Sequence, residues 1–316
     1  MKVVIPGGSG QVGTILSRAF DQAGHEVVVL SRKPNAGVWR SVDWDAETVA
    51  GWAAEIDGAD VVINLAGRSV NCRYTADNRR LIKESRVKST QVVGQAIVQA
   101  SQPPRLWLQA STATIYAHRY DAPNDEATGI IGGSEPGVPS RWRFSIDVAL
   151  GWERALNESA TPHTRKVAMR STMIMSPDRG GIFSMLLALV RFGLGGRVSN
   201  GHQFVSWIHD QDFVRAVFWL IEHEELEGVV NLAAPNPVPY AEFMRTLRVA
   251  WGMPIGLPAT RWMVEIGTFL LRTESELVLK SRRVIPGRLL RSGFVFQYPA
   301  WTGAAEELCA RWRTSH

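Results

Sequence analysis

Three equally spaced glycines near the N-terminus are the clearest sign of chemistry in this chain. They lie in the string Gly7-Gly8-Ser9-Gly10-Gln11-Val12-Gly13, directly after the apolar run 3–5. A glycine turn between a strand and a helix lets backbone N–H groups approach a pyrophosphate, whose charge the helix N-terminus favours. A turn without a ligand is the alternative. We expect a dinucleotide site here, bound by Gly7, Ser9, Gly10, Gln11, Val12 and Gly13.

The end of the next expected strand, 27–30, indicates which dinucleotide binds. That strand runs into Ser31-Arg32-Lys33, without an acidic residue. A carboxylate at this point would bond the ribose 2′-hydroxyl of NAD, whereas hydroxyl and cationic side chains suit the 2′-phosphate of NADP. Ser31, Arg32 and Lys33 therefore favour NADP (NADPH) over NAD, the alternative being a pair of solvated surface cations.

Hydroxyl side chains end another expected strand, 106–111: Ser111, Thr112 and Thr114. Ligands of parallel sheets bind at the carboxyl ends of the strands, so Thr112 is a candidate site residue. Tyr116 is the candidate acid just beyond it, and His118 and Asp147 are alternatives. Structural hydrogen bonding or packing is the competing interpretation for Thr112, Tyr116 and His118.

A metal site is not expected. His209 lies close to Asp210 and Asp212, but no third ligand converges in the sequence. Asp212 also stands where the helix expected at 213–222 needs an N-cap.

The composition is that of a globular enzyme. The chain has 316 residues, of which 45% are hydrophobic and 21% charged. No apolar stretch is long enough to cross a membrane and no signal peptide is evident, so we expect a cytoplasmic protein with no membrane partner. The net charge of +5 comes mostly from scattered arginines, without the pattern of a nucleic-acid surface. Cys72 and Cys309 are far apart and suggest no disulfide framework.

Strands and helices alternate along the first two thirds of the chain. Expected strands lie at 3–5, 27–30, 42–45, 60–67, 106–111, 166–174, 206–209 and 228–232. Expected helices lie between Gly13 and Gly24 and at 47–56, 77–100, 146–156, 183–190, 213–222, 240–252 and 258–272. This order predicts an α/β fold with a Rossmann-type, doubly wound parallel sheet. We expect an NADP-binding domain at 1–175 plus about 205–233, and a smaller C-terminal substrate lobe at about 176–204 and 234–316.

Six strings in register resemble one family. They are 7–13 (GGSGQVG), 61–67 (VVINLAG), 85–90 (SRVKST), 207–212 (WIHDQD), 231–238 (NLAAPNPV) and 293–299 (GFVFQYP). Together they resemble the epimerase-family branch of the extended short-chain dehydrogenases/reductases, the NAD-dependent epimerase/dehydratase-like proteins, that carries a characteristic C-terminal domain of unknown function.

The resemblance implies further site residues. Leu65, Ala66 and Gly67 would line the adenosine and ribose side of the cofactor. Ala110 lies on the strand that ends in the family's catalytic Ser/Thr, whose place Thr112 takes, and Met173 would pack near the nicotinamide. The resemblance also implies a small-molecule substrate and a homodimer.

One departure from the family concerns the proton. Ordinary members use a Tyr and a Lys four residues later, because a phenol needs a nearby cation to lower its pKa. None of the five tyrosines here has that lysine, and Ser145 and Ala149 align with the two positions. The leading hypothesis is an NADP(H)-dependent oxidoreductase or epimerase that uses another acid or a substrate needing little acid help. The alternative is a non-catalytic NADPH-binding protein with a regulatory or partner-binding role.

Overall fold

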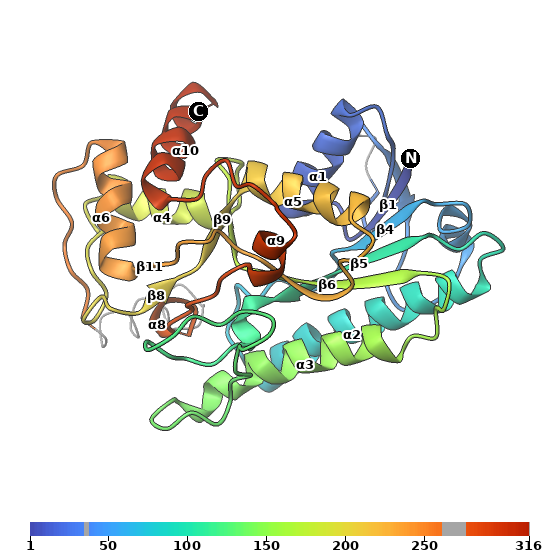
Figure 1. Cartoon of the computed structure of the whole chain (residues 1–316), viewed down its shortest axis with the longest axis horizontal. Coiled ribbons are helices and arrows are strands. Elements are labelled where there is room, and N and C mark those ends of the chain that lie inside the picture. The colour runs from blue at the N-terminus through green and yellow to red at the C-terminus, as the bar shows by residue number, and fades with distance from the viewer. Residues whose placement is uncertain (35–37, 261–275, 316) are drawn as a thin grey trace.

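The architecture is built on one seven-stranded sheet. The computed structural model describes residues 1–34, 38–260 and 276–315. The strand order is β10-β6-β5-β4-β1-β2-β3, and every pairing in this sheet is parallel, which confirms the predicted fold class (Figure 1). Its strands are β1 (Lys2–Pro6), β2 (Glu26–Ser31), β3 (Arg40–Asp43), β4 (Val61–Asn64), β5 (Leu106–Thr112), β6 (Arg165–Ser171) and β10 (Gly228–Leu232).

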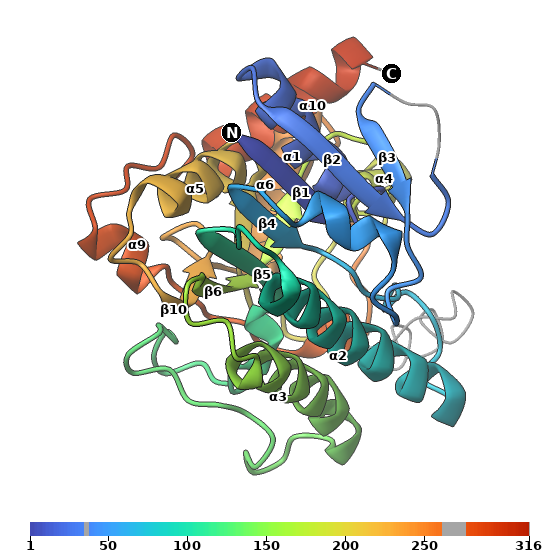
Figure 2. The same cartoon turned by 90° about the vertical axis from the view of Figure 1, so that its right-hand side faces the viewer.

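Helices cover both faces of this sheet, as Figure 2 shows. α1 (Gln11–Gln22) and α5 (Asp210–Glu222) lie on one face, and α2 (Ala76–Gln99) and α3 (Arg143–Glu158) on the other. Each face has its own hydrophobic core: Phe20 and Phe213 contribute to the first, Trp107 and Leu156 to the second. The strand order turns back between β1 and β4, which is the point where such sheets bind ligands.

A second group of elements packs beside the sheet, on the left of Figure 1. Its own core stacks Phe243 on Trp301, with ring centroids 4.0 Å apart. The domain limits stay a prediction. The helices of this part are α4 (Ile182–Arg191), α6 (Tyr240–Trp251), α8 (Glu276–Leu279) and α10 (Trp301–Ser315), and α9 (Gly287–Arg291) lies between them and the sheet. Its strands form two small sheets: β7 (Met173–Met175) with β9 (Trp207–His209), and β8 (Phe204–Val205) with β11 (Val238–Pro239).

Some expected elements differ from the structure. The strand expected at 166–174 breaks after Ser171, because β7 leaves the main sheet to pair with β9. The helix expected at 47–56 is a short 3₁₀-helix, η1 (Gly51–Glu55); the others are η2 (Ala113–Ile115) and η3 (Ser140–Trp142). The helix expected at 258–272 lies outside the described residues from 261 onward.

The predicted N-cap is also wrong. α5 starts at Asp210, and the His209 side chain caps it by accepting from the Gln211 N–H. The Asp212 carboxylate instead accepts from the N–H groups of Gln297 and Tyr298, 2.8 Å away in each case. Asp212 thus holds the segment before α10 against α5.

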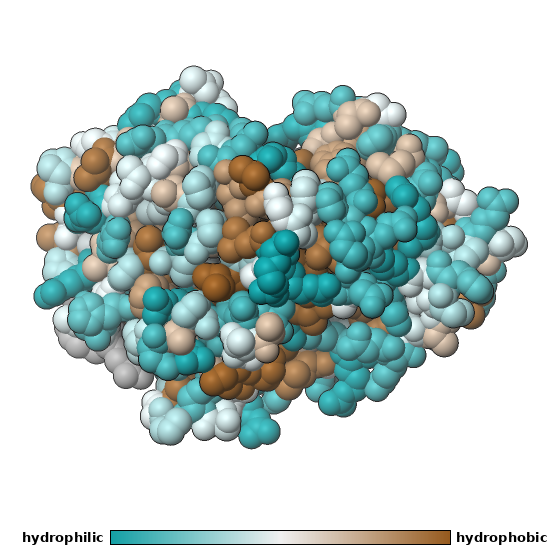
Figure 3. Space-filling model, viewed as in Figure 1, coloured by the Kyte–Doolittle hydropathy of each residue, from teal (hydrophilic) through white to brown (hydrophobic). Residues whose placement is uncertain are grey.

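The surface is mixed in character. On the face shown in Figure 3, hydrophobic residues gather near the middle of the molecule and along its lower edge, interrupted by hydrophilic ones. Within the described residues, no helix combines the length and apolar character that a bilayer crossing requires.

Candidate functional site

The glycine turn is shaped by close backbone approach. Gly7 has φ of +74°, and a Cβ there would lie 2.6 Å from Ala66 Cα; a Cβ on Gly13 would lie 2.2 Å from the Gly8 oxygen. Gly10, by contrast, faces open space and caps α1 without a side-chain hydrogen bond. The turn therefore leaves an uncapped helix N-terminus beside a free volume, which is the arrangement that accepts a phosphate group.

A cavity of about 650 Å³ opens at this turn. We call it the glycine-turn cleft. It lies at the carboxyl ends of β1, β2 and β4, and it brings together nine of the residues predicted to bind the cofactor: Gly7, Ser9, Gly10, Ser31, Arg32, Lys33, Leu65, Ala66 and Gly67. Trp44, Asp45, Ala46, Glu47, Arg68 and Ser85 complete its lining.

The wall formed by the end of β2 is rich in donors. The Ser31 hydroxyl donates to Ser9 Oγ over 3.1 Å, which joins the end of β2 to the glycine turn. Arg32 and Lys33 are exposed, and neither side chain forms an ion pair with any residue in the described ranges. Asp45 is committed elsewhere: it accepts from Thr48, whose hydrogen bonds lower the pKa of the carboxyl. The cationic side chains remain available for an anion.

Several predicted residues do not line the cleft. Val12 packs against the first core, and the Gln11 amide donates to the Asp178 carbonyl over 3.2 Å. Ala110 lies on β5 and Met173 begins β7, both partly buried. Gly13 is buried in the helix–turn contact described above.

Arg68 and Ser85 line the cleft although sequence reasoning did not select them. The Arg68 N–H donates to Ser85 Oγ over 2.9 Å, which ties the loop after β4 to α2. Their signal in the sequence was weak: Arg68 directly follows Gly67, and Ser85 begins one of the family-like strings.

Thr112 ends β5 on the carboxyl edge of the sheet. Its Oγ1 accepts from the Thr114 N–H over 3.2 Å, and within the described chain its own proton has no acceptor. The side chain is half-buried. Thr112 thus keeps one hydroxyl donor available.

Tyr116 lies in a buried polar network instead. Its hydroxyl donates to Asn231 Oδ1 and accepts from Arg170, both over 3.0 Å. Arg170 also forms a two-point ion pair with Glu153, which in turn accepts from Ser111 over 2.6 Å. Burial raises the pKa of Tyr116, which disfavours proton release. These contacts give Tyr116 a structural position, and its predicted catalytic role stays untested.

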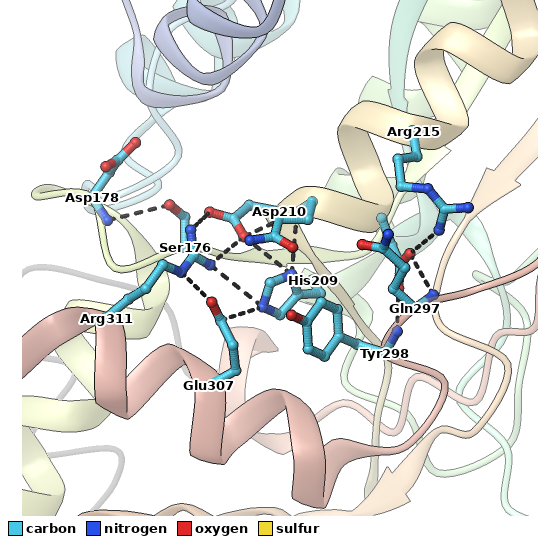
Figure 4. A network of polar contacts seen from close by, with 11 residues as sticks. Ser176, Asp178, His209, Asp210, Arg215, Gln297, Tyr298, Glu307 and Arg311 are labelled. Carbon is cyan, nitrogen blue, oxygen red and sulfur yellow. Dashed lines mark hydrogen bonds and ion pairs between the residues drawn. The ribbon is translucent and has the colours of Figure 1, made fainter.

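A second polar network joins α10 to the start of α5 (Figure 4). Arg311 binds Asp210 through two hydrogen bonds, of 2.6 and 3.1 Å, and the His209 ring binds Glu307 over 2.8 Å. Tyr298 stacks on His209 with centroids 3.8 Å apart. His209 is therefore engaged in packing and hydrogen bonding.

A larger cavity lies at the opposite edge of the sheet. It measures about 1160 Å³ and is lined by residues such as Arg165, Lys166 and Gly228, at the amino ends of β6 and β10. Parallel sheets bind their ligands at the carboxyl ends of strands, so the glycine-turn cleft is the stronger candidate site.

The sequence matches two known families. Residues 3–233 match the NAD dependent epimerase/dehydratase family, and residues 259–308 match a domain of unknown function, DUF1731. The human epimerase family protein SDR39U1 is 31% identical over 313 residues, which cover 98% of this chain and 100% of the relative.

Solved structures of epimerase-family proteins are also similar to this chain. The crystal structure of human SDR39U1 (isoform 2) with NADPH superposes with a TM-score of 0.85 at 30% identity, covering 98% of this chain and 99% of that one. A nucleoside-diphosphate sugar epimerase from Corynebacterium glutamicum gives a TM-score of 0.76 at 27% identity, covering 98% of this chain and 58% of that one. The fold, the cleft and these matches lead to one conclusion: the chain belongs to the NAD-dependent epimerase/dehydratase family and carries a C-terminal DUF1731 domain.

Proposed function

We propose that this protein is an NADPH-dependent oxidoreductase or epimerase that acts on a carbonyl or alcohol carbon of a small molecule. One observation carries the proposal: the glycine-turn cleft has free cations on its wall and shares the carboxyl edge of the sheet with the free hydroxyl donor of Thr112. The NADPH bound to the similar human protein supports the choice of cofactor.

The residues of the cleft fit a phosphorylated dinucleotide. The uncapped N-terminus of α1 would hold the pyrophosphate, for which Gly10 leaves the space. Arg32 and Lys33, with Ser31, would hold the 2′-phosphate, because a guanidinium forms charge-assisted hydrogen bonds with phosphate oxygens. Leu65, Ala66 and Gly67 would pack against the adenosine side.

NADPH, when bound, supplies a hydride. The protein's own task is to bind the substrate, to exclude water and to hold the reacting oxygen. Thr112 performs the last of these, because its free hydroxyl donates a hydrogen bond to that oxygen and so stabilises the charge that develops there.

Calorimetric titration with NADPH and with NADH tests the cofactor assignment. We expect NADPH to bind more tightly, because only NADPH carries the 2′-phosphate that the cations attract. Equal affinity for the two would contradict the proposal, and no binding of either would remove its basis.

Turnover is the second test. A panel of aldehydes, ketones and quinones is offered with NADPH, and its oxidation is followed by absorbance. Thr112→Val should lower turnover of any compound that reacts while leaving NADPH affinity unchanged. Turnover excludes the non-catalytic alternative; binding of NADPH without turnover across the panel favours that alternative.

A further inference from the structure

A buried lysine lies beside the end of β5. The Lys280 side chain is 1% exposed, and its Nζ donates to the Thr114 carbonyl over 2.8 Å. Burying a cation is costly unless a carboxylate accompanies it. Glu276, one helical turn earlier, supplies that partner, with Oε1 3.6 Å from Lys280 Nζ.

Glu276 is itself buried and only partly satisfied. Its Oε2 accepts from the Ser145 hydroxyl over 2.7 Å. Its Oε1 has no hydrogen-bond donor among the described residues. Leaving a buried carboxylate oxygen without a donor costs stability, and such groups in native proteins call for a functional reason.

These contacts form a chain that begins and ends near Thr112. Ser145 lies in the first turn of α3, next to Ile146, which shares a small core with Ala113 and Ile115. Those two residues belong to η2, the segment that directly follows Thr112. The chain Ser145–Glu276–Lys280–Thr114 therefore runs between α3, the C-terminal part and the strand end. Its two end residues, Ser145 and Thr114, are half-buried, whereas Glu276 and Lys280 are buried.

The charges around Lys280 favour easy loss of its proton. Burial lowers its pKa to about 8, and Arg282 acts in the same direction, while Glu276 and Glu135 oppose it. His118 accepts from the Ser281 N–H, and burial and Lys280 lower the pKa of its ring below 6.5. His118 is therefore neutral in the pH range where Lys280 loses its proton.

We propose that Ser145, Glu276 and Lys280 form the proton-transfer site of this protein. Ser145 gives its proton to the substrate oxygen that Thr112 holds by a hydrogen bond, and Glu276 and Lys280 are positioning residues that pass and store the proton. The C-terminal domain thereby supplies the acid–base chemistry for which this chain has no tyrosine–lysine pair. This inference rests on the proposed function.

Reduction of a carbonyl needs one hydride and one proton. When a carbonyl is reduced, its carbon gains the hydride and its oxygen gains the Ser145 proton. Glu276 passes the Lys280 proton to Ser145, and neutral Lys280 regains one from solvent. Oxidation of an alcohol follows the reverse order, with the proton leaving through Lys280.

Proton release on cofactor binding tests the site without any substrate. Calorimetry is run near pH 8 in two buffers of different ionisation enthalpy, once with NADP⁺ and once with NADPH. NADP⁺ and NADPH carry the same phosphates, but only NADP⁺ has a cationic nicotinamide ring. That ring repels a nearby ammonium and so favours loss of the Lys280 proton. If the pKa of Lys280 falls by about one unit, NADP⁺ releases about 0.4 proton more than NADPH.

Variants assign that difference. Lys280→Arg keeps the positive charge but cannot lose its proton, so the difference should vanish although the fold is held; Lys280→Met should act alike. Glu276→Gln should shift the pH midpoint of this difference downward, because the substitution removes a carboxylate that stabilises the Lys280 ammonium. Lys166→Gln is the matched control, since burial also lowers the pKa of Lys166, but at the opposite edge of the sheet; it should keep the wild-type difference.

The outcomes separate this inference from the proposed function. Equal proton release with NADP⁺ and NADPH, or a difference that persists in Lys280→Arg, overturns the inference while cofactor binding stands. Absence of binding by either cofactor removes the proposed function and the inference with it.

Discussion

In the proposed function, the choice of cofactor depends most directly on the Arg32 side chain. It is exposed on the wall of the glycine-turn cleft, where it has no ion pair with any described residue. Arg32→Ala should weaken NADPH binding by about 1.5–3 kcal/mol, or about 10- to 150-fold, because it removes a hydrogen bond to a charged group. NADH binding should hardly change. Calorimetry measures both; equal losses would show that Arg32 does not contact the 2′-phosphate, and exposed Arg80→Ala on α2 is the control.

Two glycines of the turn make a matched pair. A Cβ at Gly10 meets no atom within 4 Å, whereas one at Gly13 meets the backbone of Gly8. Gly10→Ala should therefore leave the thermal midpoint nearly unchanged and weaken NADPH, because its methyl group occupies the phosphate space. Gly13→Ala, in contrast, should lower the thermal midpoint in addition to weakening NADPH binding, since backbone atoms must move to admit its methyl group. A normal NADPH affinity in Gly10→Ala would place the phosphates elsewhere.

At the scale of elements, the docking of α10 depends on Arg311. It binds the buried Asp210 carboxylate at the start of α5 through two hydrogen bonds (Figure 4). Arg311→Met should lower the free energy of unfolding by about 2–4 kcal/mol, because it leaves Asp210 buried without its partner. Urea unfolding followed by circular dichroism measures this, and Arg80→Met, at an exposed ion pair, should change it by less than about 1 kcal/mol. A similar small change in both variants would mean that packing alone holds α10.

The same contact between α10 and α5 should weaken in acid. Burial lowers the pKa of His209 below its usual 6.5, although the Asp210 and Glu307 carboxylates oppose that shift. The neutral ring accepts from the Gln211 N–H at Nδ1 and binds Glu307 through Nε2. Between the lowered folded pKa and pH 6.5, the histidine is protonated in the unfolded chain and neutral in the folded chain. This stability is present above pH 6.5 and is lost as pH falls from there toward the lowered folded pKa.

His209→Asn tests this, because an asparagine still caps the Gln211 N–H but does not titrate. Unfolding free energies of wild type and variant are compared above and below pH 6.5. The wild type should lose more stability than the variant; parallel losses would assign the acid sensitivity to other groups.

Local and non-local elements differed in how well the sequence predicted them. The β1–α1–β2 unit is contiguous in sequence and contains most of the cleft residues between Gly7 and Lys33. Hydrophobic periodicity and glycine spacing were therefore sufficient to predict this unit. Asp212 was misassigned because its partners, Gln297 and Tyr298, are remote in sequence. Lys280 gave no local signal either, since only folding brings it to Thr114.

At the scale of the whole molecule, the cofactor should act as a stabiliser. Any ligand that binds the folded chain alone raises the free energy of unfolding by mass action, by about 2.7 kcal/mol at one hundred times its dissociation constant. NADPH should do so more strongly than NADH at the same concentration. Chemical unfolding with each cofactor measures this, and Arg32→Ala should remove the difference; a difference that persists would assign the preference to Lys33 or Ser31.

Trp44 gives the molecule an optical reporter. It is the one tryptophan, among those described, that lines the glycine-turn cleft, where it lies 4% exposed with Trp52 edge-on at 5.3 Å. The emission of a tryptophan overlaps the absorption of reduced nicotinamide, so excitation energy passes from the indole to the cofactor. Exciting the tryptophans should therefore produce fluorescence from the bound dinucleotide. Trp44→Phe should lower that signal more than loss of a tryptophan in the core of the second group of elements, such as Trp301.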